Sequence, residues 1–349
     1  MSNLIRILLV GDFIFPIYEE AFEKGFLKIT PSVYRFSLNY PESKSIFNKL
    51  LVYFERRLAI GFLTNSLNKR LVETALYTRP DLVMIYRGRN IFPSTYKMIR
   101  MKLPNTKIFI YNNDDPFSKK YPFYFWLYYK SSLKYFHHIF CYRQKNIKDL
   151  DMRGYRNTSI LMSYYIGKKN YLYNKKFTER EIDVVFIGHF ENDGRDEIIN
   201  FLLQNGISVK IFGTNWNKSK LYNILSLGNQ IERVNAEKYN DLLNQTKIAL
   251  VFLSKLNNDE YTRRCFEIPA AGAVMFSERT KKMQQLYLEN EEVVFFKDRY
   301  ELLLKLNYYL NNESLLEKIS CNARNKLFNS NHEISDRVDE IRNKYYELK

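Results

Sequence analysis

The sequence predicts an α/β protein made of two halves, each built on a mostly parallel sheet. Short apolar runs alternate with longer amphipathic segments, a pattern that is typical of buried strands covered by helices. The 349 residues are enough for two domains that each bury a core. The strand and helix pattern also starts afresh near residue 181, after a polar and basic stretch without strand character.

In the first half, five apolar runs are expected as strands. The helical patterns between them include a long one over 45–76 and a shorter one over 94–101. Pro80 ends the long helix, because proline has no N–H group to donate, and Asp81 leads directly into the next strand. The expected strands of this half are Ile5–Val10, Leu82–Tyr86, Ile108–Tyr111, His138–Tyr142 and Thr158–Met162.

The second half repeats this alternation with five more strands. Gly206 ends the first of its helices, as glycine often does at a helix C-terminus. The expected strands are Ile182–Ile187, Val209–Phe212, Ile248–Leu253, Ala273–Phe276 and Val293–Phe296. The expected helices are 195–204, 236–244, 264–271, 300–310, 314–328 and 335–348.

The domain boundary is expected in the basic, strand-free stretch. The resulting organisation is a first domain at 1–165, a linker at 166–180, a second domain at 181–330 and a C-terminal helix at 331–349, for which packing back onto the first domain is an open alternative. Each half has a Rossmann-like pattern, in which ligands bind beyond the carboxyl ends of the strands. The loops after Val10, Tyr111, Ile187 and Phe212 are therefore the first candidates for a site.

Composition excludes several classes of protein. Apolar residues make up 46% and charged residues 26%, which is typical of a globular protein rather than a disordered or collagenous one. Cys141, Cys265 and Cys321 are far apart, which fits neither a disulfide framework nor a zinc knuckle and favours a reducing cytoplasm. The N-terminus lacks a signal-peptide cleavage site, and no apolar run of about 18 residues would span a membrane.

The segment with the strongest chemical signal is RRCFEIPAAGAVM at 263–275. Arg263 and Arg264 open a short predicted helix, Glu267 follows one turn later, and Gly272 marks a turn that admits close approach of the backbone. Arginines at a helix N-terminus suit a diphosphate, and a glutamate one turn inside suits ribose hydroxyls. A helix with ordinary surface charges explains the same spacing equally well.

The sequence around this motif resembles CgeB-like, spore-protein-type glycosyltransferases of the group-1, GT-B kind. The matching segments are FEIPAAGAVMFSERT, YLENEEVVFF and ELLLKLNYYLNN in the last third, VVFIGHFENDGR at 184–195, VKIFGTNW at 209–216, AEKYNDLLNQTKIALVF at 236–252, PDLVMIYRG at 80–88 and YNNDDPF at 111–117. This resemblance implies GT-B architecture, with two Rossmann-like domains facing each other across a cleft. It also implies transfer of a sugar from a nucleoside diphosphate donor.

The resemblance further implies a donor site on the second domain. Glu267 matches the second glutamate of a paired-glutamate motif that holds the nucleotide ribose. The first glutamate of that pair would stand at Asp259, so the contact with the donor sugar departs from the family pattern, unless the adjacent Glu260 takes this role through a one-residue shift. Tyr239 lies where the family docks the nucleotide base, and a packed aromatic on an amphipathic helix is the alternative interpretation.

Two glycines and two polar residues complete the predicted donor site. Gly188 and Gly213 match tight turns at strand ends, where a side chain would obstruct the donor. His189 and Arg195 lie just beyond the first of these turns. Arg195 is expected to face the diphosphate if its helix begins near residue 194, and a solvated arginine at a helix start is the alternative.

For the reaction itself, Arg264 is expected to stabilise the departing diphosphate, so the nucleotide sugar is a substrate and no cofactor is expected. An inverting mechanism also needs a base on the first domain. Asp12, after the first strand, and Asp114 or Asp115, after the run that ends at Tyr111, are the candidates. Aspartate before proline is also common in turns. No metal site is expected, because no histidine has a metal-binding neighbour at ligand spacing.

The stretch from Lys119 to Arg180 is both basic and aromatic. It holds 14 Lys and Arg against 3 Asp and Glu, a net charge of +11 within a chain total of +16. It opens with YPFYFWLYYK, which suits an anionic membrane surface at the inner face of the cell. Inward packing of these aromatics is the first alternative, and stacking on a single-stranded nucleic acid is the second.

These observations predict a metal-independent glycosyltransferase whose acceptor is a polysaccharide, a glycolipid or a protein. A nucleotide sugar is the expected partner, and no nucleic acid is expected. One alternative is a catalytically degenerate scaffold or maturation protein with the same fold, which the aspartate at position 259 favours. A basic nucleic-acid-binding protein is the other alternative, and it depends on charge alone.

Overall fold

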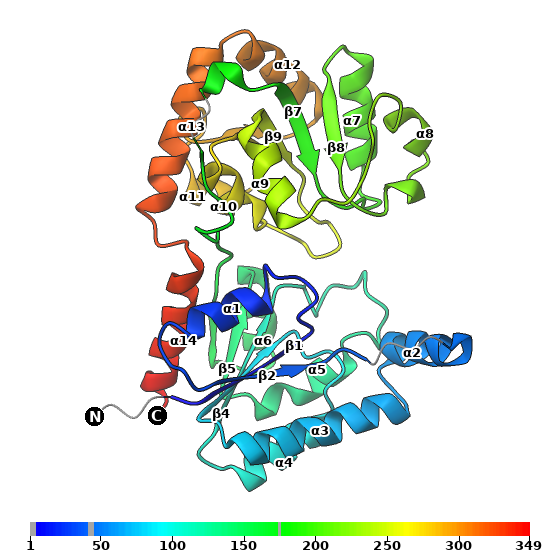
Figure 1. Ribbon diagram of the computed structural model, residues 1–349, viewed down its shortest axis with the longest axis vertical. Helices are drawn as coiled ribbons and strands as arrows, with labels where there is room; N and C mark the ends of the chain where they lie inside the picture. The colour runs from blue at the N-terminus through cyan, green and yellow to red at the C-terminus, as the bar shows by residue number, and fades with distance from the viewer. Residues whose placement is uncertain (1–4, 41–44, 174–175) are drawn as a thin grey trace. The chain divides into compact units, whose positions relative to one another are not determined.

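The computed structural model of the chain describes residues 5–40, 45–173 and 176–349, with the side chains of 46–48 excepted. It divides into two compact units, Met1–Met162 with Ile334–Lys349, and Ser163–Glu333. Each unit is a parallel sheet with helices on its faces (Figure 1). Within the described residues, no helix is long and apolar enough to cross a membrane.

The sheet of the first unit has six strands in the order β2-β1-β3-β4-β5-β6. The strands are β1 (Ile7–Gly11), β2 (Val33–Ser37), β3 (Leu82–Tyr86), β4 (Lys107–Asn112), β5 (His138–Cys141) and β6 (Thr158–Ile160). The helices are α1 (Glu19–Phe26), α2 (Ile46–Leu58), α3 (Phe62–Thr78), α4 (Pro93–Lys102), α5 (Leu127–Ser132), the 3-10 turn η1 (Leu133–Tyr135), α6 (Gln144–Asp151) and α14 (Ile334–Glu347).

Two features of the first unit differ from the sequence prediction. The edge strand β2 escapes it because Phe36 is the only buried side chain of its five residues, so the strand has no apolar run. The predicted long helix is two helices, because Ala59 takes a left-handed conformation at the end of α2. Glu55, which is buried, then accepts hydrogen bonds from the N–H groups of Leu63 (3.2 Å) and Thr64 (2.8 Å) at the start of α3.

The C-terminal helix α14 belongs to the first unit. It lies against α1 (Figure 1, red beside blue), and Val338 packs so closely on Gly25 that a Cβ there would come within 2.6 Å of it. The aromatic run of this unit packs largely inward: Trp126 and Tyr129 are buried in its core, whereas Phe123 is exposed.

The sheet of the second unit has five strands in the order β11-β10-β9-β7-β8. The strands are β7 (Ile182–Ile187), β8 (Val209–Phe212), β9 (Thr246–Val251), β10 (Val274–Glu278) and β11 (Val294–Phe296). The helices are η2 (Phe177–Glu179), α7 (Arg195–Gln204), η3 (Trp216–Lys218), α8 (Tyr222–Leu225), α9 (Ala236–Asn244), α10 (Arg264–Ala270), α11 (Lys281–Leu286), α12 (Arg299–Leu310) and α13 (Glu313–Phe328).

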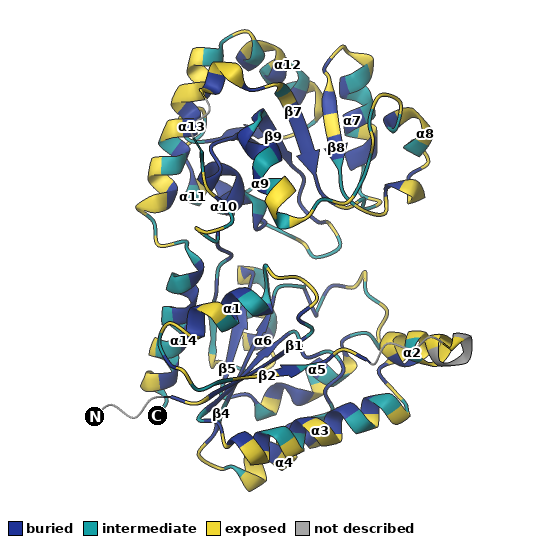
Figure 2. Cartoon of the chain, viewed as in Figure 1, coloured by how far each residue is buried: buried dark blue, intermediate teal, exposed yellow. Residues whose placement is uncertain are grey.

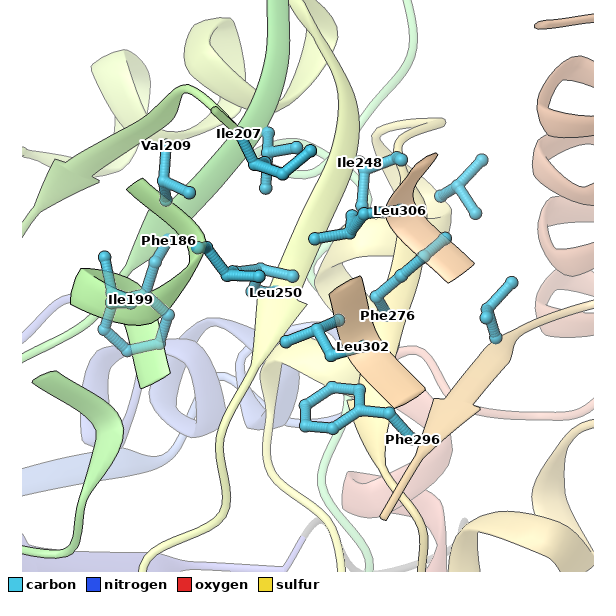
Figure 3. Close-up of a cluster of buried hydrophobic side chains, with 14 of the residues drawn as sticks. Phe186, Ile199, Ile207, Val209, Ile248, Leu250, Phe276, Phe296, Leu302 and Leu306 are labelled. Carbon is cyan, nitrogen blue, oxygen red and sulfur yellow. The ribbon is translucent and has the colours of Figure 1, made fainter. Parts of the chain in front are cut away.

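One side chain from each of four neighbouring strands forms the centre of this core: Phe186, Leu250, Phe276 and Phe296 (Figure 3). Helices α7 and α12 cover them with Ile199, Leu302 and Leu306. Figure 2 shows the strands buried and the outward faces of the helices exposed, as expected for a parallel sheet covered on both sides.

The stretch expected as a linker is part of the second unit. The backbone N–H groups of Tyr171 and Tyr173 donate to the side-chain carbonyls of Asn240 (3.1 Å) and Asn244 (3.0 Å) on α9. The Arg180 guanidinium donates to two carbonyls of the unit. These side-chain contacts hold the described residues of the segment to the unit without strand pairing, which is why the sequence shows no strand there.

Both sheets have a topological switch point next to their first strand. In the first unit β1 lies between β2 and β3, and in the second β7 lies between β8 and β9, so successive crossovers leave that strand in opposite directions. The loops after these strands part at that point and leave room for a ligand at the carboxyl edge of the sheet. Asp12 follows β1, and Gly188 follows β7.

Candidate functional site

At the carboxyl edge of the second sheet, Arg264 contacts the end of β7. Its Nε donates to the carbonyl oxygen of Ile187 at 2.6 Å, and a Cβ built on Gly188 would come within 2.8 Å of its Nη2. Arg264 is the first residue of α10 and is half-buried, with no carboxylate partner among the described residues. The structure therefore leaves a positive charge at the switch point, which its Nε bond to Ile187 holds in position.

The turns after β7 and β8 meet backbone to backbone. Gly213 has φ of +139°, and a Cβ built there would lie 1.9 Å from the carbonyl oxygen of Gly188. That same oxygen accepts a hydrogen bond from the Trp216 indole at 2.9 Å. Gly213 is thus required by the chain's own packing, a reason independent of the predicted obstruction of a donor.

Glu267 lies one turn into α10 and is buried. It accepts a 2.6 Å hydrogen bond from Nε of Arg263, whose guanidinium lies over the Tyr164 ring. The Tyr239 hydroxyl is buried beside Glu267, and burial together with the Glu267 charge raises the pKa of Tyr239 well above its usual value. The structure thus brings two other predicted residues, Arg263 and Tyr239, to the Glu267 carboxylate.

Arg195 differs from the prediction that it faces a diphosphate. Helix α7 begins at this residue, but its side chain is only 2% exposed. It makes two hydrogen bonds to the Asp193 carboxylate (2.8 and 2.6 Å) and one to the carbonyl oxygen of His189 (2.8 Å). The Asp193 carboxylate neutralises the guanidinium, and the pair fixes the loop after β7. The Arg195 side chain is therefore neither free for a diphosphate nor exposed to solvent, the two alternatives that the sequence left open.

The same loop holds an acidic residue that the sequence analysis missed. Glu191 contacts Nε2 of His189 at 2.9 Å and accepts a hydrogen bond from the Ser254 hydroxyl at 2.7 Å. Burial opposes its ionisation, but these hydrogen bonds and the Arg195 charge outweigh burial and lower the pKa of Glu191 to about 2. His189 is half exposed. Ser254 follows β9 and Glu191 follows β7, so only the sheet order brings them together.

Asp259 lies on the loop between β9 and α10 and is half-buried. Its backbone N–H donates to the carbonyl oxygen of Ser254 at 2.9 Å, which closes a turn within this loop. Its predicted part in holding the donor sugar stays a prediction.

Gly272 lies away from the predicted site. It is buried in the turn before β10, at the amino edge of the sheet, whereas ligands bind at the carboxyl edge. Its carbonyl oxygen accepts hydrogen bonds from Arg180 and Ser320, both at 2.6 Å, and a Cβ there would come within 2.9 Å of Leu172. Its close approach is to the chain itself, so its placement contradicts a substrate contact.

The candidate bases of the first unit have different environments. Asp115 is fully buried, where it accepts hydrogen bonds from the Phe117 N–H (3.0 Å) and Asn146 (2.7 Å) and pairs with Lys145 (3.1 Å). It therefore holds a turn together, and its burial contradicts a role as a catalytic base. The neighbouring Asp114 forms an ion pair with Arg87.

Asp12 has a more open environment. Its backbone is held on both sides, with its N–H donating to Glu19 (3.0 Å) and its carbonyl oxygen accepting from Asn39 (2.5 Å). Its half-buried side chain lines a cavity of about 250 Å³ at the switch point of the first sheet. Among the described residues, no donor or cation binds its carboxylate.

Four arginines line the same cavity: Arg56, Arg57, Arg87 and Arg89. The sequence analysis missed them, although Arg87 and Arg89 directly follow a predicted buried strand, which is the usual place for a ligand contact. No set of three or more His, Cys, Asp or Glu side chains suited to a metal ion occurs in the described part of the chain.

Comparison with known proteins gives a family match over part of the chain. Residues 195–343 match the family described as glycosyl transferase-like, a segment that contains Arg264 and Glu267. The prediction of a sugar-transferring enzyme is confirmed at this level, and the finer resemblance to CgeB-like proteins stays a prediction. A comparison with curated protein sequences finds no match.

Solved structures share the fold over the whole chain. HepE of Anabaena in complex with UDP-glucose has a TM-score of 0.72 at 9% identity, covering 98% of this chain and 100% of that one. Sucrose-phosphate synthase of Thermosynechococcus elongatus has a TM-score of 0.68 at 11% identity, covering 99% of each chain. A glycosyltransferase of Rickettsia africae has a TM-score of 0.66 at 14% identity, with the same coverage. The predicted fold class, two Rossmann-like domains of the GT-B type, is confirmed.

Proposed function

We propose that the protein transfers a sugar from a nucleoside diphosphate, bound at the carboxyl edge of the second sheet, to an acceptor bound at the carboxyl edge of the first. The observation that carries this proposal is the glycosyl transferase-like match, because it covers Arg264, which contacts the end of β7, and Glu267. The UDP-glucose bound to the similarly folded HepE makes a uridine nucleotide the first donor to test.

Each group of the site has a role in this proposal. Arg264 stabilises the negative charge that develops on the departing diphosphate, through the nitrogens that Ile187 leaves open. Glu267, oriented by Arg263, accepts hydrogen bonds from the nucleotide ribose. Asp12, whose backbone is fixed and whose carboxylate has no partner among the described residues, takes the proton of the acceptor hydroxyl. In this scheme fixed arginines supply the positive charge and no metal is required.

Thermal stabilisation by a panel of UDP, GDP and dTDP tests the donor site. At about 100 times its dissociation constant, a bound nucleotide stabilises by roughly 2.7 kcal/mol. We expect one nucleotide to stabilise the wild type and not Glu267→Ala, each compared with its own ligand-free form. Glu197→Ala, an exposed carboxylate on α7, is the matched control and should respond like the wild type.

Turnover completes the test. The nucleotide sugar that corresponds to the stabilising nucleotide should be consumed by the wild type, at least by slow hydrolysis without acceptor. If no nucleotide stabilises the folded protein and no nucleotide sugar is consumed, the degenerate scaffold becomes the better account.

A further inference from the structure

The cavity of the first unit concentrates positive charge at the switch point of its sheet. It is lined from five regions of the sequence: the loops after β1, β2 and β3, the last turn of α2 and the residues just before α5. The lining includes four arginines and one carboxylate, that of Asp12. Charged side chains of one sign rarely gather around a cavity unless an opposite charge offsets their repulsion.

Arg89 is fixed but not neutralised. Its guanidinium donates to the carbonyl oxygens of Arg56 and Arg57 (the latter at 3.1 Å), at the C-terminal end of α2, and lies 4.4 Å from the centre of the Phe125 ring. Helix carbonyls and an aromatic face stabilise a cation without removing its charge. Burial, and to a lesser extent the nearby Arg87 and Arg56, lower the pKa of Arg89. This environment therefore disfavours the positive charge of Arg89.

The other arginines leave the cavity with excess positive charge. Arg87 is paired with Asp114, whereas Arg56 and Arg57 have no carboxylate partner in the part of the chain that the structure describes. Counting the four arginines against Asp12 and Asp114 gives a local charge of +2. A phosphate monoester carries a charge near −2 at neutral pH and offers three oxygens, which suits several guanidinium groups converging on it.

Asp12 adds a second requirement for the ligand. A carboxylate repels an anion, so a ligand with an anionic group alone would leave this side of the cavity unused. A hydroxyl group placed a few bonds from the phosphate satisfies both sides, because it donates to the carboxylate while the phosphate lies on the arginines.

We propose that this cavity binds an acceptor that carries a phosphate group near the reacting hydroxyl, with Arg56, Arg57 and Arg89 on the phosphate and Asp12 on the hydroxyl. The acceptor role rests on the proposed function, whereas binding of the phosphate does not. A polyol phosphate or a sugar phosphate within a polymer or on a lipid has this chemistry.

Glycerol 3-phosphate is the probe for the first experiment, with the full chain at fixed ionic strength and binding measured by calorimetry. The test variant is the double substitution Arg56→Gln and Arg57→Gln, which changes two exposed side chains of one helix end. The control is Lys97→Gln with Lys102→Gln, two exposed lysines on α4 that remove the same charge from the same unit. Because each charge-assisted hydrogen bond contributes about tenfold or more, we expect at least about 10-fold weaker binding in the test variant and less than about 2-fold in the control.

Comparison ligands define the chemical class. Glycerol should not bind measurably, and glucuronate, which has one carboxylate, should bind at least about 10-fold more weakly than glycerol 3-phosphate. Equal affinity for glucuronate would overturn the assignment of a phosphate, and equal loss of affinity in both double variants would overturn the site. Displacement of glycerol 3-phosphate by UDP in the Glu267→Ala chain would show a nucleotide site here and overturn the proposal.

Asp12→Asn separates binding from transfer. Removing a negative charge next to the phosphate should leave its affinity unchanged or raise it, while transfer of the sugar falls by about 100-fold or more. If the double arginine variant loses glycerol 3-phosphate but keeps nucleotide binding, the proposal is supported. If phosphate binds as expected but no nucleotide binds, the acceptor role is overturned together with the proposed function, and the anion site stands. Soluble and lipid-linked polyol phosphates as acceptors then show which source is used.

Discussion

The carboxyl edges of the two sheets carry arginines in opposite electrostatic states. In the second unit, Arg195 and Arg263 are buried against Asp193 and Glu267, each within four positions along the chain. In the first unit, Arg56 and its neighbours line an open cavity with fewer carboxylates than cations. Arginines that a nearby carboxylate neutralises fix a loop, whereas those left in excess are available to a ligand. Arg264 is the exception in the second unit, because it has no carboxylate partner among the described residues. For this reason we assign it the stabilisation of the departing diphosphate.

Gly213→Ala should have the largest effect, because the turn of the second unit is closed by backbone rather than by charge. A Cβ lying 1.9 Å from the Gly188 oxygen forces the two loops apart, at about 4–5 kcal/mol in the free energy of unfolding. Gly228→Ala is the control: its φ is also positive, but a Cβ there meets nothing within 4 Å, so about 1 kcal/mol is expected. Urea unfolding compares the two, and equal costs would show that the turn can relax.

Asp193→Ala and Asp114→Ala compare the two kinds of arginine directly. Removing Asp193 leaves the buried Arg195 uncompensated, at about 3 kcal/mol. Removing Asp114 leaves Arg87, whose side chain is 40% exposed, and water replaces the lost partner at about 1 kcal/mol or less. Urea unfolding of the two variants measures both losses, and Asp193→Ala should be the less stable. If the order is reversed, Arg87 is the structural arginine and the contrast between the units fails.

Arg264→Ala should lower the rate of transfer by about 100- to 1000-fold while changing stability little, because one preorganised contact to the developing charge is lost. Arg264→Lys should recover part of this rate, since it keeps the charge but not the bond to Ile187. Steady-state kinetics, with the nucleotide sugar that corresponds to the stabilising nucleotide, provides the measurement. Loss of stability without loss of rate would place Arg264 with Arg195 as a structural residue.

Acid should lower the free energy of unfolding of the first unit, by less than Gly213→Ala or Asp193→Ala lowers that of the second. Burial and then nearby cations lower the pKa of His137 and of His138 to about 4, against a value near 6.5 in the unfolded chain. Between these values the unfolded chain binds protons that the folded chain excludes, so the free energy of unfolding is retained above pH 6.5 and falls as the pH drops toward 4.

His138 is the more buried of the two, and it should contribute about 1–2 kcal/mol of this loss between pH 6.5 and 5. Unfolding of wild type and His138→Gln at several pH values checks the expectation. The slope against pH should be shallower in the variant, and an unchanged slope would contradict the assignment.

Much of the fold could be predicted because its central strands are buried on both faces and therefore appear as continuous apolar runs. Leu82–Tyr86 and Ile182–Ile187 match β3 and β7 at both ends. The edge strand β2 escaped because only Phe36 is buried in it. The motif at 263–267 was visible for a similar reason, since its residues are neighbours along one short helix and need no other part of the chain to bring them together.

The sequence by itself determined the alternation of strands and helices, the division into halves and the residue types at the strand ends. The tertiary structure alone decided which charges are neutralised. Arg195 is buried against the Asp193 carboxylate, whereas Arg89 donates to the carbonyl oxygen of Arg56, 33 positions away in the chain, and keeps its charge. Local patterns record whether a side chain is buried, because burial repeats with the period of a strand or a helix. Whether a buried or half-buried charge has a partner depends on where side chains point, both between near neighbours such as Arg195 and Asp193 and between groups far apart in sequence, and no periodicity records that.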